Sequence, residues 1–528
     1  MKFPRTSGIL LHPTSLPGPY GIGDLGDAAY RWVDFLAETG QTLWQLMPLG
    51  YTGFGDSPYQ SFSAFAGDPL MISPDMLAKQ GLLTRDDLDC APKFPARHVD
   101  YGPVIEWKMA LLRTASDTFY ANGGADDDDF LAFTKENSGW LDDFALFMAA
   151  KEGHGGAAWV TWEPELRSRQ PKAIAEWTEK VAPGIKFHKF LQFQFFFEWR
   201  AVKAYANQKN IKVIGDVPIF VAYDSDDVWA NPTLFELDDE GRPLAGAGVP
   251  PDYFSATGQL WGNPLYRWNE LALRGYDWWI RRFQGALSSY DIIRIDHFRG
   301  FEAYWSVPAG EKTAVNGSWI KGPGRDLFIA VREALGDLPI IAEDLGLMTA
   351  DVLALRDEMD FPGMKILQFA FGDDPLQEYL PHNYVPNCVV YSGTHDNDTT
   401  VGWFKAAGEK EKAYYKEYTG ADGGQVHWDF IRLAFGSVAS MAIVPLQDVL
   451  GLGSEARMNT PGTAGGNWGW RYEESSLTPS LTHRLKDITH GYGRGYVRTE
   501  PKAVQAKTHH PRTHSTHPRL PHPHHPGA

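Results

Sequence analysis

Eight short apolar segments recur along the 528-residue chain, and amphipathic stretches separate several of them. Most of the segments end in polar, Gly or Pro residues, as buried strands do. They cover residues 8–11, 42–47, 211–217, 291–296, 338–344, 364–371, 388–392 and 440–446. The helical stretches cover residues 24–38, 188–207, 266–289, 324–335 and 349–358. Strands that alternate with helices form parallel sheets, and eight such units predict an α/β protein with a closed (β/α)₈ TIM barrel.

An open, doubly wound sheet is the main alternative, and it would carry a glycine-rich phosphate loop after its first strand. Gly21, Gly23 and Gly26 formally match the spacing of such a loop. However, Pro17 and Pro19 make the approach to it irregular, and no acidic residue ends the second expected strand. An isolated match of this kind is a weak signal, so the barrel is preferred.

Uneven spacing between the expected strands locates the insertions. Residues 1–490 are expected to form the barrel with its insertions, of which residues 69–190 form a largely helical subdomain between strands 2 and 3. The acidic tract at 125–130 is interpreted as a solvated loop. Residues 221–264 are rich in Gly, Pro, Asp and aromatics, as a loop that covers a substrate would be. Residues 491–528 are rich in His and Pro without apolar periodicity, which predicts a disordered tail.

Composition excludes several classes of partner. The formal charge of −17 argues against nucleic acid, whose phosphates attract basic surfaces. No apolar run is long enough to span a membrane, and the two cysteines, Cys90 and Cys388, are far apart and indicate a reducing compartment. A cytoplasmic protein is therefore expected. Aromatic residues make up 13% of the chain, and Tyr and Trp can pack on sugar rings as well as in a core.

Three of the expected strands end in acidic residues and a fourth runs into them, at the barrel end where catalytic residues lie in barrel enzymes. They are Asp216, Asp296, Glu343 with Asp344, and Asp396 with Asp398. Any one of them could be structural, but four together indicate a cleft lined with carboxylates. Crowded like charges raise at least one pKa, which makes a general acid available at neutral pH.

Arg294 and Asp296 lie two residues apart on one expected strand, so their side chains point to the same face. A cation beside a carboxylate favours the anion, so Asp296 is expected to be ionised at neutral pH and available as a nucleophile. A purely structural Arg–Asp pair is the alternative. Metal ligation is a competing use of the acids, but no close His-x-His or His-Glu-x-x-His spacing accompanies them.

Long blocks of the chain resemble the amylomaltases, which are the 4-α-glucanotransferases of glycoside hydrolase family 77 and relatives of the α-amylase clan. The blocks include LLHPTSLPGPYGIGDLG, GDSPYQSFSAFAGDP, IGDVPIFVAYDSDDVWA, GVPPDYFSATGQLWGNPLY, IRIDHFRG, IAEDLG, GTHDNDTT and GSEARMNTPGTAGGNWGWR. The resemblance spans about residues 4–486. It implies an interrupted (β/α)₈ barrel that transfers maltooligosaccharyl units between α-1,4-glucans without a metal or organic cofactor. It leaves protein partners open.

The resemblance also implies roles for individual residues. Asp296 corresponds to the nucleophile, Glu343 to the general acid/base and Asp396 to the carboxylate that stabilises the transition state. Other positions correspond to substrate-binding residues. These are Arg294 and His395, which hold the nucleophile and the ring hydroxyls; Asp216 and Tyr59, which line the same sugar subsite, with Tyr59 stacking on the ring; and Asp252, Tyr253, Phe254 and Trp261, in a loop over the acceptor side.

A retaining mechanism places the nucleophile and the acid/base about 5–5.5 Å apart. Either water or a sugar hydroxyl can then accept the glycosyl unit, and water exclusion and acceptor binding decide between them. A predominantly hydrolytic α-glucanase is therefore the nearest alternative function. A non-catalytic glucan-binding protein is the alternative from another class, although binding alone would not require all three carboxylates.

Overall fold

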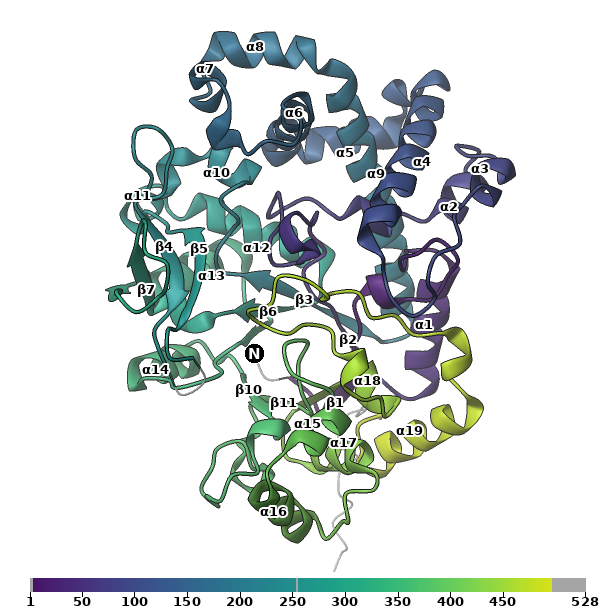
Figure 1. Cartoon of the computed structure of the whole chain (residues 1–528), viewed down its shortest axis with the longest axis vertical. Helices are drawn as coiled ribbons and strands as arrows, with labels where there is room; N and C mark the ends of the chain where they lie inside the picture. The colour runs from purple at the N-terminus through teal and green to yellow at the C-terminus, as the bar shows by residue number, and fades with distance from the viewer. Residues whose placement is uncertain (1–2, 253–254, 496–528) are drawn as a thin grey trace, which may run out of the picture. The chain divides into compact units, whose positions relative to one another are not determined.

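The computed structural model of the protein describes residues 3–252 and 255–495, and its centre is a closed parallel barrel. The strands follow one another around the barrel in the order β1, β12, β11, β10, β9, β6, β3, β2. Several of them are labelled at the centre of Figure 1. Their bounds are β1 Thr6–Leu10, β2 Leu43–Gln45, β3 Lys212–Pro218, β6 Ile292–Asp296, β9 Ile340–Ala342, β10 Gly363–Ile366, β11 Cys388–Tyr391 and β12 Met441–Pro445. Each strand overlaps one of the eight expected segments, so the predicted (β/α)₈ barrel is confirmed.

The first and last strands close the barrel. β1 pairs with β12 from Thr6↔Met441 to Leu10↔Pro445, and it pairs with β2 on its other side. Apolar side chains from all eight strands form one buried cluster. Its members are Leu10, Leu43, Ile214, Ile292, Ile341, Met364, Ile366, Val389, Tyr391, Met441 and Ile443. The barrel interior is therefore a packed core rather than a pore.

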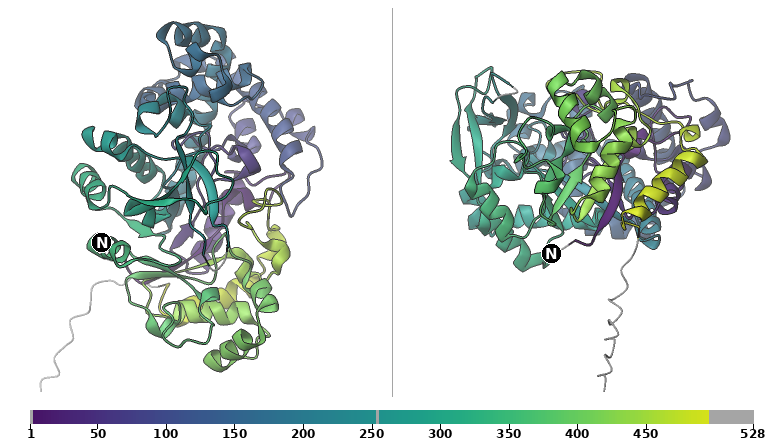
Figure 2. Two further views of the ribbon diagram at one scale, coloured as in Figure 1. Left: turned by 60° about the vertical axis from the view of Figure 1, so that its left-hand side comes forward. Right: turned by 90° about the horizontal axis from the view of Figure 1, so that it is seen from below.

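Helices surround the strands (Figure 2). They include α1 Asp27–Glu38, α9 Ala182–Gln208, α12 Asp277–Ser289, α13 Arg325–Leu335, α14 Ala350–Glu358, α15 Thr400–Ala406, α16 Glu409–Thr419, α17 Val426–Gly436, α18 Leu446–Val449 and α19 Pro479–Gly491. The single helix expected over 266–289 is instead two, α11 Trp268–Leu273 and α12. Gly275 and Tyr276 between them have φ of 65° and 58°, a left-handed conformation that interrupts a right-handed helix.

The long insertion between β2 and β3 is helical in the structure. Its helices are α2 Pro74–Lys79, α3 Arg85–Asp89, α4 Tyr101–Ala121, α5 Asp128–Glu136, α6 Ser138–Gly153, α7 Pro164–Arg167 and α8 Pro171–Lys180, and α4 to α8 gather on one side of the barrel in Figures 1 and 2. The acidic tract, expected to be a loop, begins α5: the Asp127 carboxylate accepts a hydrogen bond from the Phe130 N–H at 2.9 Å. Acidic residues stabilise the positive end of a helix dipole, which explains the difference.

Part of the segment 221–264, expected to be a substrate-covering loop region, belongs to a second, antiparallel sheet. That segment contains α10 Asp226–Ala230, β4 Ala245–Val249 and β5 Gln259–Pro264, and the sheet order is β5, β4, β7 Ala303–Pro308, β8 Ser318–Lys321. β4 has the sequence AGAGV, which lacks the alternation of apolar and polar residues that reveals a strand. Its glycines allow close backbone approach, since a Cβ on Gly248 would lie 2.5 Å from the Gln259 oxygen.

The folded unit extends to Gly495, beyond the boundary expected at residue 490. Arg494 is fully buried and donates hydrogen bonds to the carbonyl oxygens of Thr6 and Phe435, both at 2.7 Å. Arginine is rarely buried unless it is paired in this way, and composition alone did not reveal the contact. Residues 496–528 lie outside the described residues, so the disordered tail stays a prediction.

None of the helices in residues 3–252 and 255–495 combines the length and hydropathy that crossing a lipid bilayer requires.

Candidate active site

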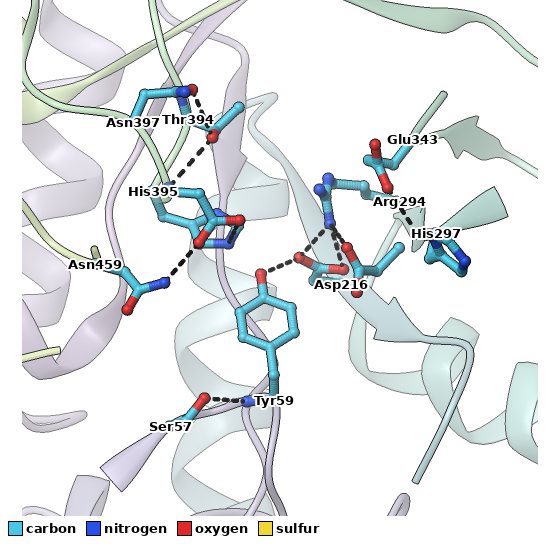
Figure 3. Close-up of polar contacts among 12 residues, drawn as sticks. Ser57, Tyr59, Asp216, Arg294, His297, Glu343, Thr394, His395, Asn397 and Asn459 are labelled. Atoms are coloured by element: carbon cyan, nitrogen blue, oxygen red, sulfur yellow. Dashed lines mark hydrogen bonds and ion pairs between the residues drawn. The ribbon is translucent and has the colours of Figure 1, made fainter. Parts of the chain in front are cut away.

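Strand register brings the acidic residues to one rim of the barrel. Asp216 on β3 pairs with Arg294 on β6. Ile295 on β6 pairs with Ala342, the last residue of β9, so Asp296 at the end of β6 and Glu343 directly after β9 occupy matching positions. Figure 3 shows His395, from the segment after β11, across the site from Glu343 and Arg294.

Arg294 links two of the carboxylates. Its Nη1 donates to both oxygens of Asp216 at 3.0 and 2.8 Å and to Oδ1 of Asp296 at 3.2 Å. The side chains of Arg294 and Asp216 are 4% and 1% exposed, whereas that of Asp296 is 31% exposed. Asp216 is therefore a buried partner of the guanidinium, and Asp296 is the carboxylate that reaches the cleft.

The ionisation of Asp296 differs from the expectation based on Arg294 alone. Burial raises its pKa to about 7, and Asp216, Glu343 and Asp396 act in the same direction while Arg294 opposes them. The sequence shows the neighbouring cation, which favours the anion as expected, but it does not show the burial that opposes it.

Two backbone amides hold the carboxylate of Glu343. The His297 N–H donates to Oε2 at 2.8 Å and the Leu345 N–H donates to Oε1 at 2.9 Å. Burial raises the pKa of Glu343, although Arg294 and these two amides lower it. A raised pKa favours the protonated carboxyl, which is the form that a general acid needs.

Asp396 has the opposite electrostatic environment. Its Oδ2 lies 3.3 Å from Nε2 of His395, and its Oδ1 accepts a hydrogen bond from Nδ2 of Asn459 at 2.7 Å. Burial alone would raise the pKa of Asp396, but His395 and Asn459 outweigh burial and lower it. For His395, burial alone would lower the pKa of the ring. The charge of Asp396 and its hydrogen bond to the ring outweigh burial, so the pKa of His395 is raised. Asp396 is therefore a stable anion at the rim.

Tyr59 connects the two sides of the site. Its hydroxyl donates to Oδ2 of Asp216 at 2.5 Å, and its ring stacks on His395 with centroids 5.1 Å apart (Figure 3). Burial raises the pKa of Tyr59 well above its usual value, so the phenol stays protonated and donates. Stacking of Tyr59 on a sugar stays a prediction.

The structure brings part of the predicted covering loop to this site. Trp261 on β5 lies edge-to-face with His297, the residue after Asp296, at 4.8 Å between centroids. Asp252 is exposed, and its Oδ1 accepts a hydrogen bond from the Ser255 N–H at 2.8 Å. Tyr253 and Phe254 lie outside the described residues.

Sequence reasoning gave no role to four residues that contact the predicted ones. Nη2 of Arg457 donates to the Asp396 carbonyl at 2.7 Å, beside the Asn459 contact described above. The ring centroids of Trp468 and Tyr59 are 5.8 Å apart, and the backbone N–H of His297 donates a hydrogen bond to the Glu343 carboxylate. All four belong to motif blocks, but only the fold shows which residues they contact.

Two cavities adjoin the site. One is lined by His12, Met47 and His395 among others, and the other reaches from Tyr59 and Asp216 to the helices α9 and α12. Among the residues that the structure describes, no group of three or more His, Cys, Asp and Glu is arranged to hold a metal ion.

Comparison with known proteins agrees with this geometry. Residues 11–478 match the family model described as 4-alpha-glucanotransferase. The chain is 54% identical over 501 residues to a 4-alpha-glucanotransferase of Synechocystis sp., covering 94% of this chain and 99% of that protein. It is 51% identical over 496 residues to one of Thermus thermophilus, covering 92% and 98%.

Solved structures give the same result. The amylomaltase from Streptococcus agalactiae in complex with acarbose is 42% identical, with a TM-score of 0.90 over 93% of this chain and 100% of that chain. The amylomaltase from Corynebacterium glutamicum, at 18% identity, supports the fold alone, with a TM-score of 0.76 over 92% of this chain and 75% of that chain. The chain therefore belongs to glycoside hydrolase family 77, the family of 4-α-glucanotransferases.

Proposed function

We propose that Asp296, Glu343 and Asp396 carry out the 4-α-glucanotransferase reaction of this enzyme. Its substrates are α-1,4-glucans, and the reaction moves a maltooligosaccharyl segment from one glucan to the 4-hydroxyl of another by retaining double displacement. The observation that carries the proposal is the register of β6 and β9, which sets Asp296 and Glu343 side by side. Opposite environments support different roles for the acids: burial raises the pKa of Glu343, whereas His395 lowers that of Asp396.

In the first half-reaction Asp296 attacks the anomeric carbon while Glu343 gives its proton to the departing glycosidic oxygen. Arg294 engages Oδ1 of Asp296, which leaves Oδ2 as the attacking oxygen. The Asp396 anion stabilises the positive charge that develops on the sugar ring. In the second half-reaction Glu343 removes the proton from the acceptor hydroxyl, whose oxygen displaces Asp296 from the anomeric carbon.

Other residues bind the substrate in this proposal. Four of them surround the sugar that is attacked: Tyr59, Asp216, Arg294 and His395. The hydrogen bonds of Tyr59 and Arg294 to Asp216, and the stacking of Tyr59 on His395, support this grouping. Asp252, Tyr253, Phe254 and Trp261 cover the acceptor side, and the position of Trp261 beside His297 supports its part in this. The enzyme is also proposed to act in the cytoplasm, which the two unpaired cysteines support.

The first test is Asp296→Ala. Without its nucleophile the variant should lose at least about 10³-fold in turnover of maltotriose, yet it should stay folded and bind maltooligosaccharide. Glu343→Gln should show a comparable loss, because an amide cannot supply the proton. Asp344→Asn is the matched control: Asp344 neighbours Glu343, but its Oδ2 accepts from Arg356 at 2.6 Å, so turnover should persist.

Product analysis distinguishes the alternatives. With maltotriose as the sole substrate, glucose should appear together with maltopentaose and longer chains. Glucose and maltose without longer chains would identify water as the acceptor and contradict transfer. Near-normal turnover by Asp296→Ala would refute the nucleophile assignment.

A further inference from the structure

The carboxylate of Glu343 is oriented by the backbone of the residue that follows the proposed nucleophile. His297 N–H donates to Oε2 at 2.8 Å, and Leu345 N–H holds the other oxygen. Two donors on different oxygens fix the plane of a carboxyl group, because rotation about the last side-chain bond would break both hydrogen bonds. The backbone of His297 and Leu345 therefore fixes the orientation of the Glu343 carboxyl group.

The His297 amide is available because the barrel ladder shifts by one residue at this point. Between β6 and β9, the Ile293 N–H donates to the Pro339 carbonyl at 2.9 Å, and the Glu343 N–H donates to the Ile295 carbonyl at 3.0 Å. Continued parallel pairing would direct the His297 N–H to the Glu343 carbonyl. Instead the Phe298 N–H donates to that carbonyl at 3.1 Å. The offset releases the His297 N–H for the Glu343 side chain.

The conformation of His297 produces this offset. Its φ of 55° and ψ of 51° are left-handed, which is uncommon for a residue with a side chain. The ring is held edge-to-face against Trp261, and it lies over Gly300, where a Cβ would be 3.0 Å from Cδ2 of His297. Strained backbone of this kind persists where surrounding packing fixes it, often at active sites.

The imidazole itself supplies no charge to Glu343. Burial lowers the pKa of His297 to about 3, with Arg299 adding to the effect, so the ring is neutral at neutral pH. Its Nε2 is buried without a hydrogen-bond partner among the described residues. The contact between His297 and Glu343 is therefore made by the peptide group and not by the ring.

We propose that His297 is a positioning residue whose left-handed backbone withdraws its N–H from the barrel ladder and directs it to Glu343. The inference rests on the proposed role of Glu343 as acid/base. The nucleophile and its partner acid are thereby coupled through one peptide unit, because the amide that holds Glu343 is bonded directly to Asp296.

A pair of substitutions separates the backbone from the side chain. His297→Gly and His297→Val both remove the imidazole, but Gly adopts the left-handed conformation readily and a β-branched residue does not. His297→Gly should keep kcat within about five-fold of the natural enzyme, and His297→Val should lower it about 100-fold, as a misplaced catalytic group does. KM for maltotriose should change equally in both, since both lose the ring.

The pH profile gives a second readout. A hydrogen bond donated to a carboxylate stabilises the charged form, so losing it raises the pKa of Glu343. The acid must be protonated to act, and the basic limb of kcat/KM should therefore move to higher pH in His297→Val and stay in place in His297→Gly.

Asn210→Val is the matched control for backbone strain. Asn210 has a φ of 60° in an exposed turn between α9 and β3, at the start of the strand, whereas Asp216 and the rim lie at the other end of it. The substitution should lower Tm as His297→Val does while leaving the pH profile unchanged. If His297→Val does not fold, His297→Ala replaces it, with a smaller shift in the same direction.

Equal loss of kcat and equal pH profiles in the Gly and Val variants would overturn the inference, because they would assign the effect to the side chain. Normal turnover by Glu343→Gln would instead overturn the proposed acid/base. The two failures are thus distinguishable.

Discussion

At the scale of single residues, burial and Arg294 act on Asp296 in opposite directions. Burial raises the pKa of this carboxyl to about 7, and Arg294 limits the rise. A nucleophile must be ionised, so the balance between desolvation and the guanidinium sets the lower end of the active pH range. Substrate-free Asp296 should consequently titrate well above an ordinary aspartate.

Arg294→Gln tests this balance. Removing the cation favours the neutral carboxyl, so the pKa of Asp296 rises and the acid limb of kcat/KM moves to higher pH. Steady-state kinetics on maltotriose across pH would measure the shift. Tm should fall as well, because Asp216 loses its buried partner.

Arg457→Gln is the control for Arg294→Gln. Arg457 also lies at the rim, but it donates to the backbone carbonyl of Asp396 rather than to Asp296. In Arg457→Gln the acid limb of kcat/KM should lie at the same pH as in the natural enzyme. An unmoved acid limb in Arg294→Gln would contradict the proposed influence of Arg294.

At the scale of elements, β5 carries Trp261, whose ring lies edge-to-face against His297 and which is proposed to cover the acceptor side. Trp261→Ala should open the cleft beside His297 to water and raise the proportion of hydrolysis, seen as more glucose and fewer long chains from maltotriose. Leu260→Ala is the matched control, because both side chains are 37% exposed on one strand but successive residues point to opposite faces. A product ratio unchanged by Trp261→Ala would argue against this covering role.

Sequence patterns revealed the elements that have a clear pattern of apolar residues. The barrel strands were predictable because their apolar runs are buried on both faces, as in the Ile292–Asp296 segment. β4 was not, because a glycine-rich strand has no side-chain pattern. Acids at strand ends were predictable from topology, whereas the contact of Asn459 with Asp396 depends on a fold that brings together residues 63 positions apart.

At the scale of the whole folded unit, two arginines near its two ends donate hydrogen bonds to the C-terminal end of α17. Arg494 and Arg5 both donate to the Phe435 carbonyl at 2.7 Å, and Arg494 also reaches Thr6 in β1. Each carbonyl left unpaired in a buried place is unfavourable by about 1–3 kcal/mol. The C-terminal end of the folded unit thus stabilises its first strand.

Two truncations test this role of Arg494. A chain ending at Gly495 should keep the Tm and activity of the full chain, whereas one ending at Tyr492 should be less stable by at least about 3 kcal/mol. Thermal and urea unfolding would measure both. Arg494→Met in the full chain should reproduce the loss, and equal stability of the two truncations would refute it.

Pairing of the first strand with the last has a consequence for synthesis on the ribosome. β1 ends at Leu10, but its partner β12 ends at Pro445 and is made much later. At about 5–20 residues per second, β1 waits roughly 20–90 s for this partner. Throughout that interval the growing sheet has an unpaired edge at β1, where other strands can add. The barrel can close only when nearly the whole folded unit has been translated.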